Sequence, residues 1–138
     1  MEKYEQFEHT GDIGIRVFGE NIENIFENAA FALFDLITDL NTVRTTDSVK
    51  ISVSADDREE LLVNWLSELN FLFLTEYKIF REFTIHELSD TQLTASAYGQ
   101  KIDPNQHVID LEIKAVTFHQ LKIEQHANGW IGQIIFDI

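Results

Sequence analysis

Two aspartates stand near opposite ends of the chain, each next to a run of aliphatic residues. Asp12 follows HTG and opens the alternating pattern IGIRV, and Asp137 follows IIF immediately before Ile138. Carboxylate oxygens are the ligands that hard divalent cations prefer, among them calcium, magnesium and manganese. If the first and last strands pair, these two side chains and the terminal carboxylate of Ile138 converge on one cation. From the pattern alone, Asp12 as a turn cap and Asp137 as a solvated residue is the more common arrangement, and the cation site is the alternative.

The sequence carries no common motif for covalent or cofactor chemistry. It has no P-loop, no G-x-G-x-x-G, no G-x-S-x-G and no H-E-x-x-H. The absence of cysteine excludes a disulfide, a thiolate zinc site and a cysteine nucleophile. The five histidines form no His-x-His or His-x3-His pair, and a single His is more often a hydrogen-bonded or surface residue than a ligand. Lys114 fits either a surface lysine or a cation placed beside an anion or a carboxylate.

The charge balance narrows the kind of partner. Ten Lys and Arg residues against 24 Asp and Glu residues give a formal net charge of -14. Affinity for nucleic acid comes largely from Lys and Arg, so direct binding of RNA or DNA is disfavoured. The charge favours a basic protein partner or a divalent cation. Acidity also serves solubility, so the charge does not decide between function classes.

Length and hydropathy predict one domain spanning residues 1–138. Hydrophobic residues make up 44% of the 138 positions, which is enough for a sizeable core. No apolar run is long enough for a membrane span, and the first residues, MEKYEQFEH, lack the apolar region of a signal peptide. We therefore expect no membrane association and a cytoplasmic location.

Two segments carry helix signals. Apolar residues recur with helical spacing over residues 22–38, after Asn21 as a candidate N-cap. A second helix starts after Asp57, and Glu60 three residues later has the spacing of a capping box. We interpret the acidic cluster over residues 56–60 as a helix cap rather than a metal site, because it suits the positive end of the helix dipole.

The remaining segments read as strands. Period-two alternation predicts strands over residues 4–18, 49–53, 83–85, 93–97, 109–113 and 130–136, with extended chain over 115–123. Asn128-Gly129 is typical of a tight hairpin before the last strand. Together the elements predict an α+β fold, a two-layer domain in which two helices pack on one face of a mixed, mostly antiparallel sheet.

Three blocks of the sequence resemble the archease family. HTGDIGIRVFGENIENIFENAAFALFDLITD resembles the family's opening, where a His-Thr-Ala-Asp stretch leads into a strand and an amphipathic helix. YGQKID followed by KAVTFHQLKIE resembles its second block, and the closing FDI resembles its acidic-aliphatic terminus. The likeness covers essentially all 138 residues in order. Gly11 stands where the family has Ala.

The resemblance implies a metal-binding, non-catalytic activator of the GTP-dependent RNA-splicing ligase. This ligase joins a 2′,3′-cyclic or 3′-phosphate end to a 5′-hydroxyl end in tRNA splicing and RNA repair. Archeases promote guanylylation of the ligase histidine and multiple turnover. Matching by motif places the metal ligands on Asp12, Asp137 and Ile138, with calcium favoured and magnesium or manganese as alternatives. It places the functional lysine on Lys114, and we expect functional roles for the nearby histidines, His119 and His9.

Two other classes of function compete with this expectation. A metal-dependent phosphoester hydrolase would use Asp12, Asp137 and His119 with a metal-activated water. A general chaperone-like interaction module would use exposed aromatic residues such as Trp130 or Phe71. The eleven Phe residues fit core stripes better than exposed surfaces.

Overall fold

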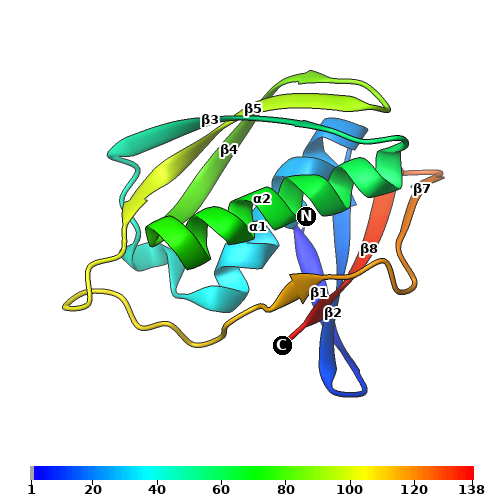
Figure 1. Cartoon of the computed structure of the whole chain (residues 1–138). Coiled ribbons are helices and arrows are strands. Elements are labelled where there is room, and N and C mark those ends of the chain that lie inside the picture. Colours follow the sequence, from blue (N-terminus) through cyan, green and yellow to red (C-terminus); the bar gives the residue numbers. More distant parts are fainter. Residues whose placement is uncertain (1) are drawn as a thin grey trace.

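The computed structural model describes residues 2–138, with two α-helices and eight strands (Figure 1). In chain order the elements are β1 Tyr4–His9, β2 Asp12–Gly19, α1 Ile22–Ile37, a 3₁₀ turn Leu40–Thr42, β3 Asp47–Ser54, α2 Arg58–Glu76, β4 Lys78–Leu88, β5 Gln92–Lys101, β6 Ala115–Val116, β7 Lys122–His126 and β8 Gly129–Asp137. Neither helix within residues 2–138 combines the length and the apolar character that a membrane crossing requires.

The strands form two antiparallel sheets. One has the order β1-β2-β8-β6, with β7 also pairing with β8, and the other has the order β3-β5-β4. The α+β class and the antiparallel pairing are confirmed, and the strands divide between two sheets. In the larger sheet the N-terminal hairpin lies beside the C-terminal strand, as Figure 1 shows.

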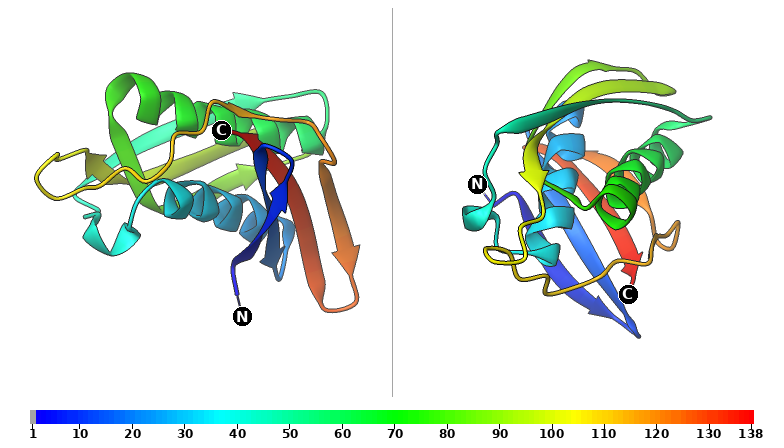
Figure 2. Two further views of the ribbon diagram at one scale, coloured as in Figure 1. Left: turned by 90° about the horizontal axis from the view of Figure 1, so that it is seen from below. Right: turned by 60° about the vertical axis from the view of Figure 1, so that its left-hand side comes forward.

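The helices join the two sheets. α1 contacts β2 and β8 of the larger sheet and β4 of the smaller one, whereas α2 contacts α1, β3, β4, β5 and β6 (Figure 2). Because α1 meets partners on more than one side, it buries eight residues: Ile25, Phe26, Ala29, Ala30, Ala32, Leu33, Phe34 and Ile37. The small alanine side chains allow neighbouring elements to approach closely. The Phe and Ala stripe of the sequence is therefore core.

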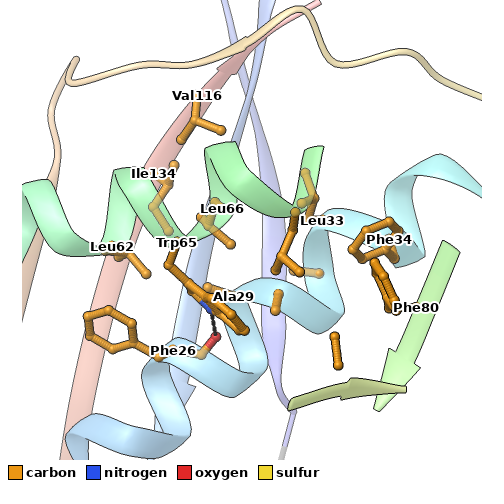
Figure 3. Close-up of a cluster of buried hydrophobic side chains, with 14 of the residues drawn as sticks. Phe26, Ala29, Leu33, Phe34, Leu62, Trp65, Leu66, Phe80, Val116 and Ile134 are labelled. Carbon is orange, nitrogen blue, oxygen red and sulfur yellow. Dashed lines mark hydrogen bonds between the residues drawn. The ribbon is translucent and has the colours of Figure 1, made fainter. Parts of the chain in front are cut away.

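Trp65 lies at the centre of this core. Its indole Nε1–H donates a hydrogen bond of 2.9 Å to the carbonyl of Phe26, which links α2 to α1 (Figure 3). Phe34 of α1 meets Phe80 of β4 edge to face, with ring centroids 5.6 Å apart. These contacts bury large aromatic surfaces while satisfying the one polar group of the indole.

The predicted helix starts are confirmed. Asn21 Oδ1 accepts a hydrogen bond of 2.8 Å from the Asn24 amide. Asp57 Oδ1 accepts one of the same length from the Glu60 amide, and the Glu60 carboxylate in turn accepts from the Asp56 amide at 3.1 Å. The acidic cluster before α2 is a cap, as the sequence indicated.

Three strand predictions were wrong in detail. Residues 4–18 form a hairpin, because Thr10-Gly11 make a two-residue turn in which Gly11 has φ +75°. Residues 109–113 form no strand: the Asp110 amide donates to the Ile37 carbonyl, Leu111 and Ile113 pack on the core, and Ile109 is exposed. The last hairpin is present, but its turn falls on residues 127–128, because His126 pairs with Gly129.

A partly buried tyrosine connects the edge strand β1 to α1. The Tyr4 hydroxyl donates a hydrogen bond of 2.6 Å to the Asp35 carboxylate. Burial, together with this carboxylate, raises the pKa of Tyr4 well above its usual range. The contact therefore holds β1, and the turn that follows it, in place at neutral pH.

Gly99 is predicted to be indispensable to the smaller sheet. A Cβ atom there would lie 1.9 Å from the Ile79 carbonyl oxygen and 2.7 Å from the Phe80 Cα, both backbone atoms beside the bulge in β4. Gly99→Ala should lower the free energy of unfolding by about 3 kcal/mol, measured by chemical denaturation. Gly11→Ala is the matched control, since its Cβ meets nothing within 4 Å and only its φ costs about 1 kcal/mol. Equal effects of the two changes would contradict the steric argument.

Candidate functional site

The strand pairing gathers four residues from distant parts of the chain into one row. His9 of β1 pairs with Asp12 of β2, Asp12 pairs with Asp137 of β8, and Asp137 pairs with Ala115 of β6. We call these four residues the strand-end row. It contains both aspartates that the sequence singled out, brought together from positions 125 residues apart along the chain (137 minus 12).

Asp12 and Asp137 point to the same side of the larger sheet. Directly opposed residues of antiparallel strands share a face, and successive residues alternate between faces. The next pair, Ile13 with Phe136, belongs to the side packed on the helices, where Phe136 is fully buried. The two carboxylates are therefore on the face turned away from the helices, where both residues are partly buried.

The paired carboxylates are electrostatically unfavourable by themselves. Cβ atoms of directly opposed residues lie about 5 Å apart, and like charges in such positions destabilise a strand pair. A divalent cation between them replaces repulsion with attraction. The donors are all oxygen atoms, which fits calcium, magnesium or manganese better than zinc.

Two side chains alone do not complete the coordination of such a cation. Among the side chains that the structure describes, no group of three or more His, Cys, Asp or Glu is placed to hold a metal ion. A hollow of about 600 Å³ beside Asp12 is lined by Gly11 and Ile138 as well. The Ile138 side chain packs against the core. Backbone carbonyls and water are further oxygen donors of the kind that such a cation accepts.

Lys114 lies directly beside the row. Its backbone amide donates a hydrogen bond of 2.8 Å to the Asp137 carbonyl, while its side chain is exposed. The preceding carbonyl, of Ile113, accepts a hydrogen bond of 2.8 Å from the Asn70 side chain of α2. Hydrogen bonds thus fix the backbone on both sides of Lys114. Its side chain is exposed, so the ammonium group is accessible to a partner.

The two histidines are placed differently. His119 is exposed in the turn between β6 and β7, and its amide donates to the Thr117 hydroxyl at 3.2 Å. It lies outside the strand-end row, so the carboxylate and histidine set of a hydrolase is not assembled there. The His9 backbone is part of the row, and its side chain is outside what the structure describes.

Asn70 is a site residue that the sequence analysis missed. It is 4% exposed, and its Oδ1 atom has no hydrogen-bond partner within the described part of the chain. A buried polar atom without a partner lowers the folding stability by about 1–3 kcal/mol. We therefore expect Asn70 to have a structural or functional role. The sequence feature that could have indicated Asn70 is a polar residue among the leucines and phenylalanines on the buried side of a helix.

The fold and the row define a small α+β protein with an acidic, oxygen-rich site where β2 meets the last strand, β8. The Archease protein family model matches residues 4–138. Protein archease of Methanosarcina mazei is 40% identical, covering 99% of this chain and 97% of that protein. Protein archease of Pyrococcus abyssi is 41% identical over the whole of both chains. The chain belongs to the archease family.

Solved structures agree with this assignment. The solution structure of protein 1598 of Methanobacterium thermoautotrophicum superposes with a TM-score of 0.81, at 34% identity and with both chains fully covered. The crystal structure of an archease from Thermotoga maritima, described as a possible chaperone, gives a TM-score of 0.65 at 19% identity, covering 96% of this chain and 94% of that one. The second likeness supports the fold alone.

Asn70→Ala should loosen the backbone around Lys114, because the Ile113 carbonyl loses its donor. We expect the free energy of unfolding to fall by about 2 kcal/mol, and amide hydrogen exchange to accelerate at Lys114 and its neighbours. Asn64→Ala on the same helix is the control, since Asn64 bonds to the Ser54 carbonyl at 2.9 Å, away from this segment. Unchanged exchange at Lys114 in Asn70→Ala would contradict the positioning role.

Proposed function

We propose that this protein is a non-catalytic accessory factor that binds a divalent cation at the strand-end row and activates the GTP-dependent RNA-splicing ligase. Membership of the archease family and the resemblance of the three sequence blocks support the partner. The observation that carries the proposal is the direct opposition of Asp12 and Asp137 across β2 and β8. Like charges in directly opposed positions repel, and a divalent cation bound by both carboxylates would relieve that repulsion.

Each residue of the site has a part in this function. Asp12 and Asp137 hold the cation, with Ile138 contributing its terminal carboxylate and calcium favoured over magnesium or manganese. A bound cation supplies positive charge that attracts phosphate or carboxylate groups. Lys114 presents its ammonium group to a nucleotide phosphate or to a carboxylate of the ligase. By these contacts the protein promotes guanylylation of the ligase and its multiple turnover in tRNA splicing or RNA repair.

The charge of the chain fits this partner. A ligase that holds RNA needs a basic surface, and a protein of net charge -14 is attracted to such a surface. The same charge opposes direct contact with RNA. In this proposal the protein contacts the ligase, in the cytoplasm, and RNA is bound by the ligase alone.

Metal binding is testable without the ligase. Calcium at about 100 times its Kd should stabilise the wild-type protein by about 2.7 kcal/mol, seen as a rise of several degrees in Tm. Asp12→Asn and Asp137→Asn should lose this rise, because each removes a ligand charge. Asp110→Asn, an exposed aspartate outside the row, is the control.

The same titration tests Ile138. A peptide tag joined after Ile138 removes its free carboxylate and should weaken calcium binding at least about tenfold, by analogy with the loss of other supporting groups around a metal. The same tag at the N-terminus should leave the affinity unchanged. Equal affinities for the two tagged proteins would refute the role of Ile138.

The proposed activity is tested by RNA ligation with substrate in excess over the ligase. Wild-type protein should give many turnovers, and Asp12→Asn should give few, because the cation site is lost. Full activation by Asp12→Asn would refute the metal mechanism and keep the activator. No stimulation by the wild-type protein would refute the proposed function itself.

A further inference from the structure

The described part of the chain exposes large apolar side chains on α2 and on two connecting segments. Six large hydrophobic residues are exposed in the described part of the chain: Phe71, Leu74, Tyr77, Val108, Ile109 and Phe118. The first three lie at the C-terminal end of α2, and the next two belong to the segment that follows β5. α2 crosses the front of the molecule in Figure 1, and the three residues at its C-terminal end are exposed. Single exposed hydrophobic residues are ordinary, whereas a cluster marks an interaction surface.

We call Phe71, Leu74 and Tyr77 the α2 patch. Phe71 and Leu74 are one turn apart on α2, and Tyr77 caps the helix in the left-handed conformation. Phe71 is 54% exposed and Tyr77 59% exposed. Beside Phe71 lies a hollow of about 420 Å³, lined by Val53 and Glu68 among others. A protruding ring next to a hollow is a shape that can interlock with a partner.

Hydrogen bonds connect the α2 patch to the strand-end row. The Ile102 amide donates to the Tyr77 carbonyl at 2.7 Å, and the Ile113 carbonyl accepts from Asn70 one turn before Leu74. The next amide, of Lys114, bonds to Asp137. Segment 102–114 therefore leaves α2 at Tyr77, passes the end of α1, where the Asp110 amide donates to the Ile37 carbonyl at 2.7 Å, and returns to α2 at Asn70 before it reaches the row. A partner that covers the row is within reach of the patch.

The surroundings of the α2 patch carry charges of both signs, Lys78 and Lys101 among them, with acidic side chains in excess. The last turn of α2 contains no basic residue, although it is the negative end of the helix dipole. It carries Glu76, whose contact with Lys78 at 3.5 Å is a partly exposed ion pair of little strength. Asp110 and Glu112 are exposed on the adjoining segment. An apolar centre with an acidic rim is complementary to apolar side chains flanked by Arg and Lys.

We infer that the α2 patch is a docking surface for a basic protein, and that this protein is the ligase of the proposed function, on which the inference rests. A second copy of this chain is a poor occupant, because two acidic rims at a net charge of -14 each repel. Phe71 is the central anchor. The patch supplies affinity, and the strand-end row supplies activation.

The test measures binding and activation separately, with the full chain and the purified ligase. Phe71→Ser and Leu74→Ser should raise the Kd for the ligase by about tenfold to a hundredfold, as expected for anchor residues. Phe118→Ser is the matched control, since Phe118 is 60% exposed and lies in the turn after β6. Unchanged Tm values of all three variants verify that the fold is intact. Binding should also weaken with added salt, because the rim is charged.

The ligation assay then separates the patch from the row. At saturating concentration the Phe71→Ser protein should restore full multiple turnover, whereas Asp12→Asn should bind like wild type and activate poorly. Unchanged affinity of Phe71→Ser and Leu74→Ser, or equal loss with Phe118→Ser, would overturn the docking surface while leaving the proposed function intact. A wild-type protein that does not bind the ligase would overturn both. Self-association of the wild type that Phe71→Ser abolishes would assign the patch to a second copy instead.

Discussion

The pairing of β2 with β8 is the constraint on which the rest of the molecule depends. It joins the first hairpin to the last strand, closes the larger sheet and sets Asp12 opposite Asp137. A slip of one residue would move every side chain of β8 to the other face, taking Phe136 out of the core and Asp137 into it. The burial of Phe136 therefore fixes the geometry of the site. Core packing and the candidate metal site are two consequences of one register.

Packing of the helices stabilises this register. α1 packs between β2 and β4, and α2 is joined to it through the hydrogen bond from Trp65 to the Phe26 carbonyl. Segment 102–114 crosses from the end of α2 to the strand-end row without strand pairing, held instead by hydrogen bonds such as that from Asn70 to Ile113. A segment held in this way keeps the Lys114 backbone in place while leaving its side chain exposed. Rigidity and accessibility are combined at the position where a partner would need both.

Acidic charge is common to the strand-end row, the surroundings of the α2 patch and the chain as a whole. The opposed carboxylates of the row are the basis of the proposed cation site, and acidic side chains flank the α2 patch. The net charge of -14 favours a basic partner at both places. The apolar α2 patch adds a contribution that salt does not screen.

The sequence by itself determined the helices, their caps and the α+β class, because helical periodicity and capping are local properties that few residues decide. It also singled out Asp12, Asp137 and Lys114, partly through residue chemistry and partly through family resemblance. Only the tertiary structure decided that the strands form two sheets, that residues 109–113 remain unpaired, and that Asn70 holds the segment before Lys114. These features depend on contacts between residues far apart in the chain. Alternation along a strand shows which residues share a face, but the partner strand and its register are set by how the whole core packs.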